Sequence, residues 1–135
     1  MAGRRRRPED EQQRALFQWA DRAGGRYPDL HLMFHVPNGG ARSKIEAGIM
    51  KGLGVKPGVP DIQLPVARGG YAGLWIEMKA PGARARTTDN QKFWVRRLTG
   101  EGYKVVVCDD WMVAREVLLT YMSAPLSLCQ VEAAG

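Results

Sequence analysis

Residues 74–108 constrain the fold more than any other part of the chain. They begin with an apolar run over 74–80 that predicts a strand, and a basic loop separates this run from a segment with helical periodicity. A continuous apolar and β-branched run over 103–108 then predicts a second strand, one buried on both faces of a sheet. A strand, a helix and a strand in this order predict a βαβ unit with parallel strands, and therefore an α/β fold. The predicted helix presents one face made of Gln91, Trp94, Val95 and Leu98.

The rest of the sequence supplies the other parts of one domain. Helices are expected over 8–23 and 43–53, and a last helix begins after Asp110 with Val113, Val117 and Tyr121 on one face. Strands are expected over 31–36 and 59–65, with a glycine-rich connection over 67–73. We therefore expect a mixed central β-sheet flanked by helices, in a single domain over 8–122, between a basic arm over 1–7 and a loose tail over 123–135.

The charge balance indicates a polyanionic partner. Twenty Lys and Arg residues stand against fourteen Asp and Glu residues, which gives a net charge of +6, and the run from Arg4 to Arg7 supplies part of the excess. No apolar stretch approaches the length of a membrane span, so we expect a cytoplasmic protein with no membrane contact. The two cysteines, Cys108 and Cys129, lack the spacing and the histidine partners of a zinc site.

Two acidic residues and a lysine form the strongest chemical pattern in the sequence. Asp61 follows Pro60, fifteen residues separate it from Glu77, and Lys79 comes two residues later. Because side chains alternate across a strand, Glu77 and Lys79 project from one face and the apolar residues from the other. Burying unpaired charge is expensive, and a divalent cation between the two carboxylates removes that cost. The pattern predicts a Mg²⁺ site made by Asp61, Glu77 and the backbone carbonyl of Met78, with Lys79 placed to act on a phosphoryl group or its attacking water.

The bare pattern also fits an exposed Glu–Lys pair on an edge strand with Asp61 in a turn, and longer blocks of sequence favour the metal site. These blocks are VPNGGAR over 36–42, GVKPGVPD over 54–61, WIEMK over 75–79, and Gln91. In order and spacing they resemble the virus-type replication-repair nuclease (VRR-NUC) family of the PD-(D/E)xK nuclease superfamily. The resemblance extends from about Pro8 to Met122.

The resemblance implies a restriction-endonuclease-like fold and Mg²⁺- or Mn²⁺-dependent endonucleolytic hydrolysis of DNA in phage or bacterial replication or repair. Small stand-alone members of the family resemble Holliday-junction resolvases that act as homodimers, so branched DNA and a second copy are the implied partners. A flap or single-strand nuclease, or a nickase, is the alternative that uses the same residues. The alternative outside the enzymes is a basic DNA-binding accessory protein whose carboxylates bind no metal.

Two further groups of residues are candidates for the active site, and the histidines are not. Gln91 completes the capping-box pattern of Thr88, and it also shares the face that packs on the sheet, so both roles stay open and the resemblance favours the catalytic one. In related nucleases an acid on the first helix joins the metal cluster. Glu9, Asp10 and Glu11 are the acids available there, and helix phase favours Glu9, although all three also suit the dipole of a helix N-terminus. The two histidines, His31 and His35, lack a third ligand nearby and are interpreted as ordinary strand residues.

Basic and turn residues are candidates for binding the substrate. By family resemblance, Asn38 and Arg42 contact the phosphate backbone or hold the catalytic loop, although Asn38 suits a simple turn equally well. Arg84 and Arg86 follow Lys79 in a loop and are expected to continue a positive track along DNA.

Overall fold

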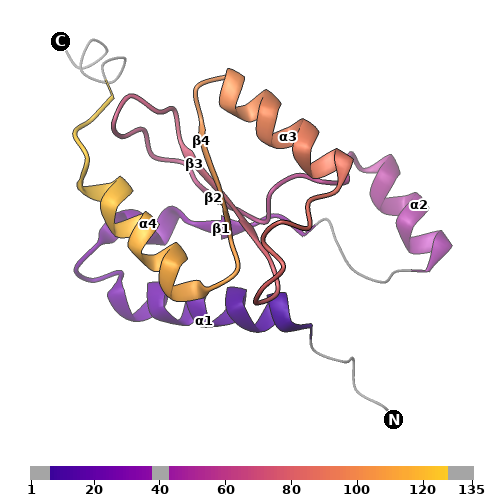
Figure 1. Ribbon diagram of the computed structural model, residues 1–135, viewed down its shortest axis with the longest axis horizontal. Coiled ribbons are helices and arrows are strands. Elements are labelled where there is room, and N and C mark those ends of the chain that lie inside the picture. Colours follow the sequence, from indigo (N-terminus) through magenta and orange to yellow (C-terminus); the bar gives the residue numbers. More distant parts are fainter. Residues whose placement is uncertain (1–6, 38–42, 128–135) are drawn as a thin grey trace.

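The computed structural model describes residues 7–37 and 43–127, which form a four-stranded sheet between helices (Figure 1). The elements follow in the order α1 (Pro8–Ala23), the 3-10 helix η1 (Pro28–Leu32), β1 (Phe34–His35), α2 (Lys44–Gly52), β2 (Ile62–Leu64), β3 (Leu74–Met78), α3 (Asp89–Gly100), β4 (Lys104–Cys108) and α4 (Trp111–Ser123). The strand order is β1-β2-β3-β4, antiparallel except for the parallel β3–β4 pair. The predicted mixed sheet and its βαβ unit are confirmed.

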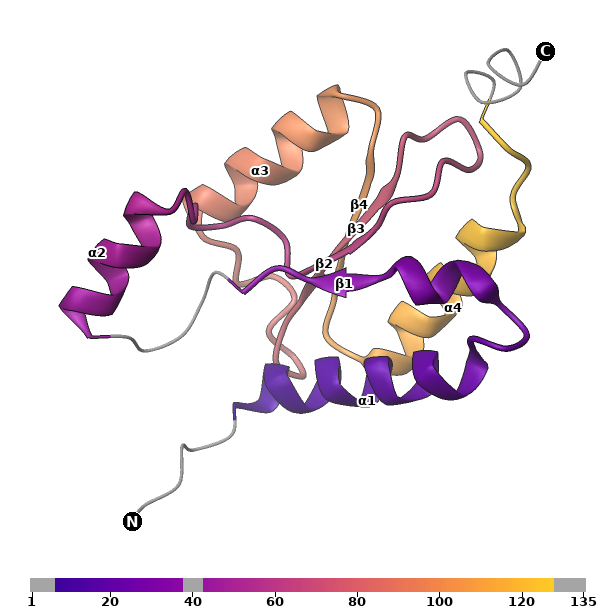
Figure 2. The same cartoon turned by 180° about the vertical axis from the view of Figure 1, so that it is seen from behind.

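The main core lies on one side of the sheet. Helices α1 and α4 pack against each other and against this side, and α3 lies across the sheet from them (Figures 1 and 2). Leu16 of α1, Ile76 of β3 and Leu118 of α4 are fully buried there. Each such side chain contributes about 1.5–3 kcal/mol of burial free energy. By contrast, no residue of α3 is fully buried, so the α3 side of the sheet is the thinner layer.

The prediction of a strand over 31–36 is mostly wrong. Residues 28–32 form η1, and only Phe34 and His35 pair with β2. The buried side chains of this segment are Leu30 and Met33, which are three residues apart. That spacing belongs to a 3-10 turn and not to a strand, and the Met33 N–H donates to the Leu30 carbonyl at 3.2 Å.

Strand β4 was expected to be buried on both faces, and it is not. It stands at the edge of the sheet, and Lys104 to Val107 are only half-buried. A β-branched run fits an edge strand covered on one face as well as a central strand, because strand propensity reflects packing on a pleated surface and does not encode strand order.

Helix α4 and the residues after it also differ from expectation. The buried face of α4 is Ala114, Leu118 and Tyr121, whereas Val113 is exposed. The residues that follow α4 pack on the β2–β3 connection and are not loose, because the Ser127 hydroxyl donates to the Tyr71 carbonyl at 2.8 Å. Residues 128–135 lie outside the described residues. Among the described helices, none combines the length and apolar character needed to cross a membrane.

Candidate active site

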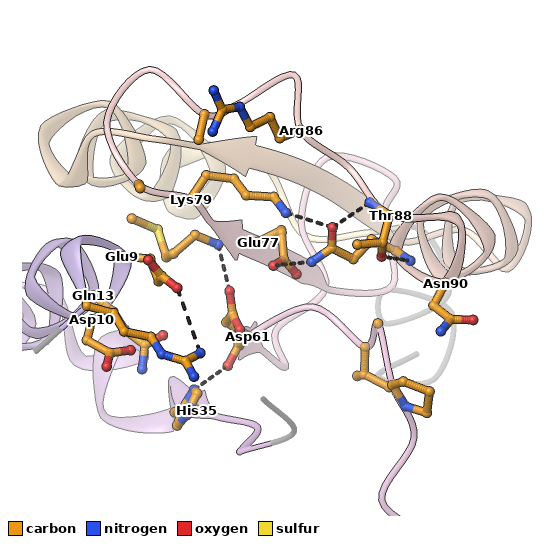
Figure 3. A pocket seen from close by; sticks show the side chains of 18 of the residues that line it. Glu9, Asp10, Gln13, His35, Asp61, Glu77, Lys79, Arg86, Thr88 and Asn90 are labelled. Carbon is orange, nitrogen blue, oxygen red and sulfur yellow. Dashed lines mark hydrogen bonds and ion pairs between the residues drawn. The ribbon is translucent and has the colours of Figure 1, made fainter. Parts of the chain in front are cut away.

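The β2–β3 hairpin brings Asp61 and Glu77 together. Ile62 pairs with Ile76 in the antiparallel register, and the next position along that register sets Asp61 opposite Glu77. The Asp61 side chain is fixed because the Met78 N–H donates to its Oδ2 at 2.8 Å. Its backbone is fixed as well, because the Val36 N–H donates to the Asp61 carbonyl at 2.7 Å. The two carboxylates therefore occupy a defined position at the end of the sheet (Figure 3).

The Glu77 carboxylate is buried and the Asp61 carboxylate beside it is half-buried. Glu77 is 5% exposed. Burial raises its pKa to about 9, and the neighbouring negative charge of Asp61 adds to the increase. Burial also raises the pKa of Asp61, although the hydrogen bond from the Met78 backbone opposes this. Two acids whose charged forms are both disfavoured form a site that a cation would stabilise.

Gln91 connects the lysine, the glutamate and the start of α3. The Lys79 Nζ donates to the Gln91 Oε1 at 2.6 Å, and the Gln91 Nε2 donates to the Glu77 Oε1 at 3.2 Å. The same Oε1 accepts from the Thr88 N–H at 3.0 Å, and the Thr88 Oγ1 accepts from the Gln91 N–H at 3.2 Å. The capping box and the site contacts, which the sequence left as alternatives, are thus present together.

A pocket of about 670 Å³ opens over these residues, where the N-terminal ends of α1 and α3 meet the end of the sheet. Asp61, Glu77 and Lys79 line it, as do Met78 and Gln91. All five of these predicted site residues are therefore brought together in one cavity.

Helix α1 forms one wall of the pocket. Glu9 lines the pocket and its Oε1 lies 4.0 Å from the Arg7 Nη1, whereas Glu11 is exposed and does not line it. This is the orientation that helix phase predicts, and a metal-binding role for Glu9 stays a prediction. Asp10 and Gln13 also line the pocket (Figure 3), and the sequence interpretation gave Gln13 no role.

His35 is a site residue that the sequence interpretation missed. Its ring lines the pocket, and its Nδ1 lies 2.8 Å from the Asp61 carbonyl (Figure 3). The acceptor is a carbonyl oxygen, so Nδ1 carries the proton in this hydrogen bond. This contact depends on the pairing of β1 with β2, in which His35 lies opposite Ile62, and the sequence alone does not show that pairing. His31 lies in η1 beside Gly24, where an added Cβ would come within 2.6 Å of its Cε1.

The basic candidates fall in different places. Arg86 lines the pocket, whereas Arg84 is exposed and does not. Asn38 and Arg42 lie outside the described residues.

The segment from Pro57 to Val59 forms part of the pocket rim and packs closely against α3. Gly58 has φ +87°, and a Cβ there would lie 2.5 Å from the backbone carbonyl carbon of Asn90. Only glycine suits this position. The Trp94 Nε1 donates to the Pro57 carbonyl at 3.1 Å and ties the rim to the same helix.

The donor set of this pocket fits a hard divalent cation. Mg²⁺ is commonly held by one or two carboxylates together with water and substrate phosphate oxygens. Asp61 and Glu77 supply the carboxylates. In the described ranges, no three His, Cys, Asp or Glu side chains are arranged so that they could hold a metal ion together.

Comparisons with known proteins agree with this geometry. The family model of the VRR-NUC domain matches residues 9–111. A solved structure described as a VRR_NUC domain protein is 29% identical, with a TM-score of 0.73 over 91% of this chain and 94% of that one. No significant match was found among curated proteins. The chain therefore belongs to the VRR-NUC domain family, whose membership implies a nuclease-type function with DNA as the substrate.

Proposed function

We propose that the protein is a divalent-metal-dependent endonuclease that hydrolyses phosphodiester bonds in DNA. The observation that carries this proposal is the pairing of the buried Glu77 with the half-buried Asp61, beside Lys79 in an open pocket. A purely structural protein gains nothing from two adjacent, largely desolvated acids whose charges repel, whereas a metal-dependent hydrolase requires them.

Asp61 and Glu77 would hold Mg²⁺ or Mn²⁺, with the Met78 carbonyl as a further ligand. Glu9 would join them after its side chain turns away from Arg7 and towards the ion. The bound ion would polarise a phosphoryl oxygen and make a water molecule more acidic. Lys79 has three N–H donors and gives one to Gln91. The other two can orient the attacking water and stabilise negative charge on the phosphoryl oxygens. Gln91 holds the Lys79 ammonium group in place before the substrate binds. Less side-chain conformational entropy is therefore lost during the reaction.

Basic side chains at the pocket would bind the DNA backbone. Arg7 and Arg86 line the pocket, where they can contact the phosphates on either side of the one that is cut. Arg84, Asn38 and Arg42 are proposed to extend this contact. We also propose that the protein acts in the cytoplasm on branched DNA during replication or repair, as a homodimer that presents two active sites to one junction.

The first test is cleavage of labelled DNA in Mg²⁺ by the wild type and two variants. Asp61→Asn is expected to lower the cleavage rate at least a hundredfold while DNA binding is kept or strengthened, because it removes a metal ligand and a negative charge near phosphate. Lys79→Ala is expected to lose about 10²–10³ in rate, the typical cost of losing one preorganised donor, and to keep the Mn²⁺ affinity measured by calorimetry.

Three results would count against this proposal. An Asp61→Asn protein that cuts at the wild-type rate would rule out the site, and a Lys79→Ala protein that loses Mn²⁺ as fully as Asp61→Asn would rule out the role of the lysine. A wild type that binds DNA but cuts none in Mg²⁺ or Mn²⁺ would favour the accessory-protein alternative.

A further inference from the structure

The outer face of α3 carries an aromatic ring that the proposed chemistry does not use. Phe93 is 47% exposed, which is high for a phenylalanine. Its ring is nevertheless held in place, because the Trp94 ring meets it edge-on with centroids 6.0 Å apart. The Arg96 guanidinium lies 5.9 Å from the Phe93 centroid. The ring is therefore ordered while one part of it faces solvent.

The surroundings of Phe93 are positively charged. Lys92, Arg96 and Arg97 are all exposed on α3, where Asp89 is the one acidic residue. In the described ranges of the chain, no acidic side chain forms an ion pair with these three cations. An exposed ring among Lys and Arg side chains suits a nucleic-acid strand, because the cations contact phosphate and the ring contacts a base. A contact between protein surfaces is usually depleted of Lys.

The same helix begins at the active-site pocket. Asn90 and Gln91 in its first turn line the pocket. Asn90, Phe93 and Arg97 then lie at i, i+3 and i+7 and so share one side of the helix. Phe93 is about 4.5 Å further along the helix axis than Asn90. When a DNA phosphate binds in the pocket, the neighbouring nucleotide would be within reach of Phe93. The bond from Trp94 to Pro57 keeps this side of α3 in register with the pocket rim.

We propose that Phe93, with Lys92, Arg96 and Arg97, is a stacking platform for an unpaired nucleotide next to the phosphate that is cut. The inference rests on the proposed nuclease function and names its substrate class, DNA with unpaired bases beside the cleavage position. A base inside a duplex has both faces covered by its neighbours, so it offers no surface to Phe93. An unpaired base at a flap or a junction offers a free face.

The test measures binding without cleavage, in EDTA, with 2-aminopurine as a fluorescent base. The base is placed either unpaired in a splayed-arm DNA or paired in a duplex of the same length. Phe93→Ala is expected to weaken binding of the splayed arm about tenfold, the usual effect of losing one base–aromatic stack, and to change duplex binding less than twofold. Phe93→Trp is expected to keep the affinity and the change in 2-aminopurine fluorescence, whereas Phe93→Leu behaves like Phe93→Ala.

Tyr71 provides a matched control. It is 39% exposed, and the Lys104 Nζ lies 5.3 Å from its ring centroid, but it belongs to the β2–β3 connection at the opposite end of β3 from Glu77. Tyr71→Ala is expected to leave binding of the splayed arm unchanged. Thermal unfolding of each variant shows that it is folded at the assay temperature.

Three outcomes would overturn the platform. These are an equal loss of duplex and splayed-arm binding in Phe93→Ala, full binding by Phe93→Leu, and a change in sedimentation of free Phe93→Ala that shows this face to be a contact between copies. The proposed function fails separately. If the wild type cuts DNA and Phe93→Ala binds the splayed arm as well as the wild type does, only the platform is rejected. If the wild type stacks the base but never cuts DNA, only the nuclease function is rejected.

Discussion

Gln91 carries two duties that are usually divided between residues. Its side chain closes the capping box of α3, and it also bridges Lys79 and Glu77. The Gln91 conformation that the helix cap stabilises is therefore also the one that holds the Lys79 ammonium group. The Thr88 hydroxyl bonds within the cap, to the Gln91 N–H, and an alanine at this position keeps the backbone N–H that donates to the Gln91 side chain. The two duties can therefore be separated by mutation.

Thr88→Ala is expected to lower the free energy of unfolding by about 1 kcal/mol, the typical value of an N-cap, and to change the cleavage rate less than threefold. Gln91→Ala is expected to lower the cleavage rate at least tenfold, because the Lys79 ammonium loses its anchor. Urea unfolding and single-turnover cleavage measure the two effects. Equal loss of rate in both variants would show that the cap alone sets the activity.

Glu77 makes the stability of the metal-free protein depend on pH. An acid whose pKa is raised in the folded state keeps its proton there after the unfolded chain has lost its own, so stability is highest below the ordinary pKa near 4.5 and falls as pH rises towards the raised value of about 9. The decrease for one proton is at most about 1.4 kcal/mol per pH unit. Urea unfolding in EDTA at pH 5, 7 and 9 should show a steeper decline for the wild type than for Glu77→Gln, and parallel curves would contradict this.

The sequence placed Asp61, Glu77 and Lys79 in one site because their arrangement depends on local rules. Alternation along a strand orients Glu77 and Lys79, and the hairpin of two consecutive strands brings Asp61 back beside them. His35 could not be found in the same way. Its contact with the Asp61 carbonyl depends on the pairing of β1 with β2 across 26 residues of chain, and no local pattern encodes that pairing.

At the scale of elements, the helices were predictable and the sheet edges were not. Pro8 opens α1, and Asp110 caps α4 by accepting from the Met112 N–H at 2.8 Å. Both are local signals that sequence displays directly. The edge position of β4 depends on which strand is its neighbour, and the replacement of a strand by η1 depends on whether Leu30 and Met33 find a core together.

Two glycines, one in the connection before β2 and one inside α2, have opposite expected effects when replaced by alanine. Gly58→Ala should destabilise the protein by 1 kcal/mol or more, roughly the cost of a positive φ for a non-glycine residue, because its Cβ also meets the Asn90 backbone. Cleavage should fall with it, since the rim moves. Gly48→Ala, inside α2 with open space around it, should stabilise the protein by about 0.5–1 kcal/mol. Thermal unfolding compares the pair, and a Gly58→Ala protein as stable as the wild type would contradict the tight contact.

At the scale of the whole molecule, charge and symmetry are expected to act on different steps. The net charge of +6 should make the binding of duplex, junction and single-stranded DNA weaken with salt alike, through counterion release. Cleavage should favour the junction, because two fixed sites in a homodimer meet only DNA that bends or branches.

Sedimentation of the free protein, and cleavage of a four-way junction beside a linear duplex of the same sequence, test this expectation. The junction should be cut at least tenfold faster. A strict monomer that cuts both at equal rates would remove the resolvase proposal and leave the chemistry of the site untouched.

The register of the β2–β3 hairpin has a consequence for how such an enzyme is controlled. Asp61 and Glu77 face each other because Ile62 pairs with Ile76, and both isoleucines are fully buried. A slip of one residue would turn these isoleucines out of the core, so a folded molecule always has its acids assembled. A change of register is therefore unsuited to act as a switch in this hairpin. We expect control of the protein to act elsewhere, through the supply of the metal ion or through access to the right DNA.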